Sequence, residues 1–155
     1  MTNDFQSRSS KVGKAFEDEC AELLERCGFV EIERRPSFPE VGVEADVAAL
    51  TAGGAEIVFE CKAGTAETKR PGGMADTDNI KKAIADASLL ATVKDPVPYI
   101  VLTTHIAEAG RGAAMINRAL DIGLFFAVVN VRQDTDGIEM LRGLAASTGL
   151  VEAWA

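Results

Sequence analysis

The sequence predicts an α/β domain in which helices flank a single mixed β-sheet. Two observations support this fold class. Segments with the apolar spacing of amphipathic helices alternate with short strand-like runs, and the later runs are apolar almost throughout, as is typical of buried parallel strands. The 155 residues are 47% hydrophobic and 26% charged, which suffices for one core, so we expect residues 1–155 to form a single domain.

The first half of the chain contains one expected helix and three expected strands. Residues 13–27 have the spacing of an amphipathic helix that ends at Gly28. Residues 29–34 resemble a short strand, and prolines interrupt the chain after it. Residues 43–50 and 56–62 are two further strands joined by a glycine-containing turn, which predicts a β-hairpin.

The second half alternates helices and strands after a long loop. Residues 63–77 lack any periodicity and form this loop, and loops of that length are often functional. The expected elements that follow are a helix over 78–93, a strand over 98–104, a helix over 111–121, a strand over 124–131 and a helix over about 137–147. An apolar tail that contains Trp154 ends the chain.

The net charge of −8 is unusual for a protein that binds phosphates, because such proteins typically present a basic surface. A cluster of site carboxylates adds negative charge that a divalent cation would neutralise. Basic residues also gather in a few places. The candidates for contacts with a DNA backbone are Lys14, Lys69, Arg70, Lys81 and Lys82.

Neither a membrane span nor an export signal is expected. No window approaches the roughly 18 uninterrupted apolar residues that a membrane-spanning helix needs. The polar N-terminal segment lacks the apolar centre of a signal peptide. Cys20, Cys27 and Cys61 fit neither a disulfide framework nor a zinc site. We therefore expect a cytoplasmic protein without a membrane partner.

Glu17 is a carboxylate on the apolar arc of the expected first helix. It projects near Cys20 and Leu24, whereas the other acidic residues of this helix lie on the opposite face. A carboxylate that faces a core is costly unless something pairs with it. One explanation is a boundary position from which the side chain reaches solvent, or an ion pair with an arginine such as Arg34 or Arg35. The other is a shared metal ion.

The expected hairpin carries charges where a sheet interior would be apolar. Alternation along residues 56–62 places Glu60 and Lys62 on one face. Asp46 lies among small and apolar residues of the preceding strand, although Asp is disfavoured in strands. A surface salt bridge of Lys62 with Asp46 or Glu60 would explain the hairpin alone.

Taken together, these residues indicate a metal site. Two carboxylates on adjacent strands, a nearby lysine and Glu17 from a helix that covers the sheet can converge on one point. Oxygen-rich clusters suit Mg²⁺ or Mn²⁺, and such a cation can polarise a phosphoryl oxygen and lower the pKa of a bound water. Lys62 can orient the attacking water and stabilise negative charge.

The order of these residues resembles the PD-(D/E)XK, or restriction-endonuclease-like, superfamily. The matching segments are GKAFE at 13–17, GVEADV at 42–47 and FECK at 59–62. The resemblance thus spans positions 13 to 62, and the later order of helices and strands also fits the superfamily core, αβββαβα. Ala45 stands where the motif's name has proline.

This resemblance implies a Mg²⁺-dependent DNA endonuclease, in which Mn²⁺ can substitute, with a role in restriction, defence or DNA processing. It implies that Asp46 and Glu60 ligate the metal, together with the backbone carbonyl of Cys61. Glu17 would be an outer or second-metal ligand. Lys62 would be the base that positions the water.

Three alternatives within this interpretation stay open. The GFxxxxRR segment at 28–35 and the ECK triplet resemble both Mrr-type restriction nucleases and archaeal-type Holliday junction resolvases. The chain can also be a catalytically silent module of the same fold that binds nucleic acid or protein. Outside this interpretation, a small acidic α/β protein with fortuitous salt bridges stays open as well. Because so small a chain has little room for a separate target-reading domain, we expect a homodimer or a larger complex that supplies recognition.

Overall fold

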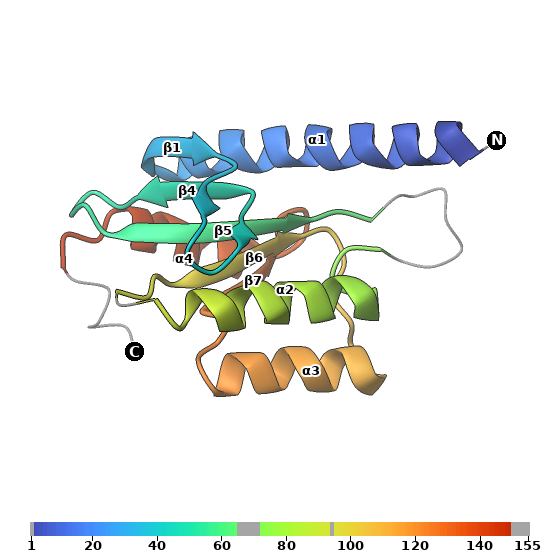
Figure 1. Ribbon diagram of the computed structural model, residues 1–155. Helices are drawn as coiled ribbons and strands as arrows, with labels where there is room; N and C mark the ends of the chain where they lie inside the picture. Colours follow the sequence, from blue (N-terminus) through green and yellow to red (C-terminus); the bar gives the residue numbers. More distant parts are fainter. Residues whose placement is uncertain (1, 65–71, 94, 150–155) are drawn as a thin grey trace.

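The computed structural model describes residues 2–64, 72–93 and 95–149, and shows an α/β domain whose central sheet is covered by helices (Figure 1). The elements are α1 (Thr2–Cys27), β1 (Val30–Arg34), β2 (Ser37–Phe38), β3 (Val43–Glu44), β4 (Val47–Leu50), β5 (Glu56–Lys62), α2 (Thr77–Leu90), β6 (Tyr99–Thr103), α3 (Gly110–Asp121), β7 (Ala127–Asn130) and α4 (Thr135–Ala145). Lys69, Arg70 and Trp154 lie outside the described residues.

The expected mixed sheet is confirmed. Its five strands lie in the order β1-β4-β5-β6-β7, and β2 pairs with β3 in a separate two-stranded ribbon. The expected hairpin is present, with β4 antiparallel to β5 and Val47 opposite Phe59. β5, β6 and β7 are parallel, and every residue of β6 is buried. β6 is therefore the buried interior strand that its apolar run predicted, whereas β7 lies at the sheet edge and only Val129 of its residues is buried, so the expectation of a buried strand over 124–131 is met only in part.

Because side chains alternate along β5, the strand contributes residues to two separate hydrophobic cores on opposite faces of the sheet. Ile57 and Phe59 point to the face that α1 and α4 cover, and Val58 points to the face that α2 and α3 cover (Figure 1). Phe59 packs edge-on against Phe29, with ring centroids 5.3 Å apart. Glu60 and Lys62 follow Val58 on the α2 side, so β5 carries its charged residues toward a helix and not toward solvent alone.

The expected strand over 43–50 is wrong in one respect, because the chain bends at Ala45 and Asp46 and splits it into β3 and β4. The physical reason lies in the preceding segment. Arg35 adopts a left-handed backbone conformation with φ of 52°. Its N–H donates to the Asp46 carbonyl, and the Ala45 N–H donates to the Pro36 carbonyl. These bonds take the place of regular sheet pairing at the bend.

Other elements also differ from their expected bounds, α1, α2 and β7 by the most. α1 begins at Thr2 and not near residue 13, because no proline or glycine precedes Gly13 to interrupt it. α2 ends at Leu90, a few residues early. β7 omits the start of the 124–131 run because Leu124 and Phe125 donate their N–H groups to the carbonyl of Ala119, at the end of α3.

The expected cap at Gly28 is confirmed, and α2 has a side-chain cap as well. Gly28 follows α1 with φ of 105°, and its N–H donates to the carbonyl of Glu25. Asp76 precedes α2 and accepts a hydrogen bond from the N–H of Asp78 at 2.8 Å. α1 extends past the sheet at its N-terminal end (Figure 1), yet none of the helices in the described residues is both long and apolar enough to cross a membrane.

Candidate active site

The charged residues of the hairpin meet where β4 begins and β5 ends. Since Val47 pairs with Phe59, the residue before β4 and the residue that follows Phe59 are neighbours across the two strands. Those residues are Asp46 and Glu60. The structure therefore brings together the two carboxylates that the sequence assigned to a metal, at the open end of the hairpin.

Asp46 is fixed by the main chain of β5. Its Oδ2 accepts a hydrogen bond from the N–H of Cys61 at 2.7 Å. The carboxyl also lies close enough to Glu17 and Glu60 to raise the pKa of both through charge and through side-chain hydrogen bonding. Asp46 is thus the residue that links the helix and the strand of the site.

Glu60 is a buried acid with two partners. Only 5% of the residue is exposed, and burial together with the negative charge of Asp46 raises its pKa to about 8, although Lys62 opposes the shift. The hydroxyl of Tyr99 donates to Oε2 at 2.9 Å, and the Lys62 ammonium lies 3.3 Å from Oε1. Both oxygens therefore have an identified donor, and the ion pair forms within β5 and not across strands.

Glu17 is held by arginines on one side and borders Asp46 on the other. Its side chain is 14% exposed and lies 3.4 Å from Arg34 and 3.6 Å from Arg35. Burial and the charge of Asp46 raise the pKa of Glu17, while the two guanidinium groups lower it. The arginine pairing is therefore present together with the proximity to the other carboxylates, and the two explanations for Glu17 are not exclusive.

Cys61 presents its side chain to the opposite face of the sheet. The thiol packs against the core beneath α1, where a hydrogen bond with Cys20 and burial raise its pKa well above the ordinary value. A thiol held in the neutral form is a poor metal ligand. This geometry leaves the backbone carbonyl as the group that Cys61 can contribute to a site on the Glu60 side.

The donor atoms suit a hard divalent cation, although the side chains alone do not form a full ligand set. Within the described ranges, no group of three or more His, Cys, Asp or Glu side chains is arranged to hold a metal ion. Asp46 and Glu60 supply two carboxylates, and Cys61 can supply a main-chain oxygen, which is the donor type that Mg²⁺ prefers. The raised pKa values of Glu17 and Glu60 indicate crowded negative charge that a cation would relieve.

Two residues of this region were not predicted from the sequence. Tyr99 opens β6 and contacts Glu60 because parallel pairing places it beside Val58. Asp86 lies on α2, and its pKa is raised by burial and lowered by Lys62, so its carboxyl faces the lysine. Tyr99 could have been noticed as a tyrosine at the start of an otherwise apolar strand. The sequence around Asp86 contains no comparable signal.

The backbone around Lys62 is tied to β6. The buried hydroxyl of Thr103 donates to the Lys62 carbonyl at 2.7 Å and accepts from the N–H of Met74 at 3.1 Å. A side chain on Gly73, which has φ of 59°, would place Cβ 2.6 Å from that hydroxyl. His105 follows β6, and its ring nitrogen Nδ1 lies 2.8 Å from the hydroxyl of the adjacent Thr104.

The remaining candidates for DNA contact lie on helices beside the site. Lys14 is exposed on α1, three residues before Glu17, and Lys81 and Lys82 are exposed at the start of α2. None of these three lysines forms an ion pair with another described residue.

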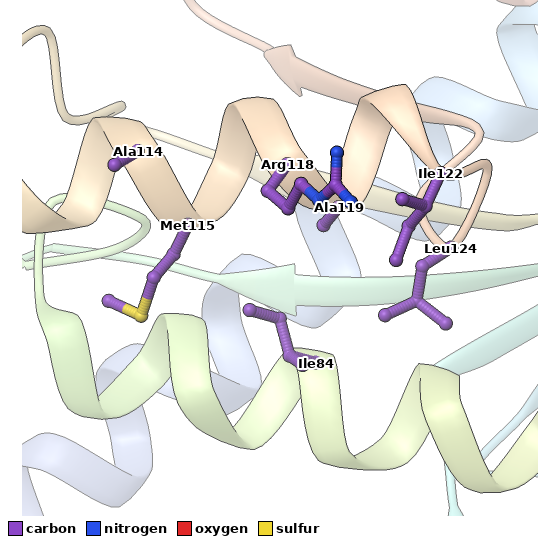
Figure 2. A pocket seen from close by; sticks show the side chains of 7 residues that line it. All are labelled: Ile84, Ala114, Met115, Arg118, Ala119, Ile122 and Leu124. Carbon is purple, nitrogen blue, oxygen red and sulfur yellow. The ribbon is translucent and has the colours of Figure 1, made fainter.

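A shallow apolar groove separates α2 from α3 and is distinct from the carboxylates. It encloses about 320 Å³, and Ile84 on α2 points toward Met115 on α3 across it (Figure 2). Ile122 at its end is 58% exposed, and Arg118 is its charged lining residue. No candidate site residue lines this groove.

Comparison of the chain with protein-family models, with curated proteins and with solved structures found no match.

Proposed function

We propose that this protein is a divalent-metal-dependent nuclease of the PD-(D/E)XK, restriction-endonuclease-like superfamily that hydrolyses phosphodiester bonds in DNA. The observation that carries the proposal is the meeting of Asp46, Glu60 and Lys62 at one end of a hairpin, with Glu17 beside Asp46. The element order, a helix, an antiparallel meander and then alternating helices and strands, is in keeping with the αβββαβα core of that superfamily.

In this proposal Asp46 and Glu60 hold the cation through carboxylate oxygens, and Cys61 contributes its backbone carbonyl. When bound, Mg²⁺, or Mn²⁺ in its place, polarises a phosphoryl oxygen and lowers the pKa of a coordinated water. The main-chain bond from Cys61 to Asp46 supports the assignment, because it fixes one oxygen of this carboxylate and so orients the group.

Lys62 acts on the water and on the phosphate. Its side chain is 19% exposed, so the ammonium sits at the rim of the buried carboxylates and not beneath them. From there it orients the attacking water and stabilises the negative charge that develops on the phosphate. Asp86 on α2 lies near enough to the same ammonium for Lys62 to lower the pKa of its carboxyl.

Glu17 has a secondary role in this proposal, as an outer ligand or a ligand of a second cation. Arg34 and Arg35 already neutralise it, so it shifts toward a cation only when these ion pairs loosen. The arginines therefore support a weaker dependence of activity on Glu17 than on Asp46 or Glu60.

The test is the cleavage of supercoiled plasmid DNA in Mg²⁺, in Mn²⁺ and in EDTA. Glu60→Ala and Lys62→Ala should each reduce cleavage at least about 100-fold, which corresponds to roughly 2.7 kcal/mol of transition-state stabilisation. Glu56→Ala is the matched control, because Glu56 is an exposed carboxylate at the other end of the same strand. Cleavage by the Glu60 and Lys62 variants at the wild-type rate would reject the site.

Two arms of the experiment separate the related functions. Preference for a four-way junction over linear duplex would favour a structure-specific, resolvase-like nuclease. Binding of DNA or of a protein without any cleavage would favour a silent module, and one observation agrees with that alternative. Glu17 and Glu60 already have cationic partners within the chain, so their charges are balanced without a metal.

We further propose that DNA is the partner, and that a second copy of the chain or a larger complex supplies target recognition. Exposed Lys14, Lys81 and Lys82 support a phosphate-binding surface on α1 and α2, while the net charge of −8 favours help from another protein. Light scattering of the active protein tests the oligomer. Full cleavage of both strands by a strict monomer would argue against it.

A further inference from the structure

Tyr99 is the one phenol of the chain, and its place in β6 brings it under the site. It pairs in parallel register with Val58, so its side chain leaves the same face of the sheet as Glu60. Its residue is 3% exposed, and its hydroxyl lies 2.9 Å from Oε2 of Glu60. In the described part of the chain, that carboxyl is the hydrogen-bond partner of the hydroxyl.

The ring of Tyr99 has little freedom to move. It stacks on Phe125 with ring centroids 5.9 Å apart and an interplanar angle of 19°. The buried residues around the two rings belong to the core beneath α2 and α3, which includes Val58 and Leu90. A phenol fixed in this way holds its hydroxyl at one place, and a buried hydroxyl is costly unless its partner stays in position.

The two donors to Glu60 differ in mobility. Lys62 reaches Oε1 at 3.3 Å with a flexible, partly exposed side chain, whereas Tyr99 reaches Oε2 with a rigid and buried one. When Lys62 turns toward a phosphate and its water, Tyr99 remains as the contact that sets the plane of the carboxyl. A phenylalanine would fill the same space beside Phe125, so packing alone does not require the hydroxyl.

We infer that Tyr99 is a positioning residue, which holds the carboxyl of Glu60 in the orientation that binds a divalent cation; the inference rests on the proposed function. Hydrogen-bond partners of metal ligands fix ligand orientation, and their removal typically lowers metal affinity about 10–100-fold. Tyr99 acts through Glu60 and does not itself contact substrate or cation.

The experiment measures Mn²⁺ binding by electron paramagnetic resonance, without DNA, for wild type and Tyr99→Phe. The Phe variant should bind Mn²⁺ about 10–100-fold more weakly. Its DNA cleavage should fall at low Mg²⁺ and return toward the wild-type rate at saturating Mg²⁺, because a weakened site fills at higher concentration. A purely structural role would lower the rate at every Mg²⁺ concentration.

Two further variants make the outcome specific. Thr51→Val removes another buried hydroxyl, at the far end of the hairpin, and should leave Mn²⁺ binding unchanged. Phe125→Leu keeps the phenol and removes the ring that it stacks on, and should weaken Mn²⁺ binding by a smaller factor than Tyr99→Phe. Equal losses in Thr51→Val and Tyr99→Phe would overturn the inference, since the effect would then be general.

Failure of the inference is distinguishable from failure of the proposed function. If wild type binds Mn²⁺, Glu60→Ala does not, and Tyr99→Phe binds as wild type does, then the metal site stands and the role of Tyr99 is rejected. If wild type itself binds no Mn²⁺, both the proposed function and the inference about Tyr99 are rejected.

Discussion

The two ends of the β4–β5 hairpin differ in how their polar and charged groups are accommodated. At the turn end, the Thr51 hydroxyl accepts a hydrogen bond from the N–H of Ala55, Gly53 donates to the carbonyl of Ser147, and the carboxylate of Glu56 is exposed to solvent. At the open end, the buried carboxyl of Glu60 lies beside the half-buried carboxylate of Asp46, and burial together with the charge of Asp46 raises the pKa of Glu60. The same two strands thus have one end whose contacts favour stability and another end where carboxyl groups repel each other. Such crowding of titratable groups is typical of functional sites.

The largest expected effect comes from Asp46→Asn at the open end. The amide keeps an acceptor for the N–H of Cys61 but loses the charge that a cation needs, so cleavage should fall at least about 100-fold. The free energy of unfolding in EDTA should stay level or rise, because the repulsion toward Glu17 and Glu60 is removed.

Plasmid cleavage and urea unfolding measure the two quantities for Asp46→Asn, with Glu56→Gln as the control. Loss of stability together with loss of cleavage would indicate that the open end is a structural ion cluster.

A smaller effect, on stability alone, should come from the turn end. A Cβ on Gly53 would lie 2.7 Å from the carbonyl oxygen of Thr148, which is backbone and cannot easily move. Gly53→Ala should therefore lower the free energy of unfolding by about 1–3 kcal/mol, as is usual for overpacking. Gly54→Ala, which meets no atom but has a left-handed φ of 87°, separates strain from collision.

Urea denaturation measures the cost of both glycine variants, and Mn²⁺ binding by the folded proteins should equal that of wild type. A change in metal affinity would mean that the two ends of the hairpin are coupled.

The last expected effect is a pH dependence of stability that arises from Glu60. Folding raises the pKa of this carboxyl from its ordinary value of 4.5 to about 8, so the folded protein retains a proton that the unfolded chain releases. The resulting stability is complete below pH 4.5 and is lost as the pH rises through 8. Above that pH the buried carboxylate is charged beside Asp46.

Urea midpoints in EDTA between pH 5 and 9 test this dependence, with Glu60→Gln as the variant that lacks the titration. Wild type should lose stability relative to Glu60→Gln as the pH rises, and Glu56→Gln should follow wild type. A midpoint difference that does not vary with pH would show that Glu60 titrates near its ordinary value.

Much of the fold and part of the site could be predicted from the sequence because local patterns encode them. The alternation in β5 placed Glu60 and Lys62 on one face, and the apolar run of β6 predicted a buried strand. The bend at Asp46 could not be predicted, because it depends on the left-handed conformation of Arg35 and on bonds to a separate segment. Tyr99 was missed because its contact depends on the register between distant strands.

The hydrogen bonds between the turn at Gly53 and the residues after α4 restrict where the length of this chain can vary. Surface turns usually tolerate insertions, yet the Gly53 turn is bonded to the residues after α4. One added residue between Asp46 and Glu60 that shifted the pairing by one step would rotate Glu60 to the α1 face and bring Phe59 to the site. Insertions and deletions in related chains should therefore lie elsewhere, because the length of this hairpin fixes the spacing between the two carboxylates.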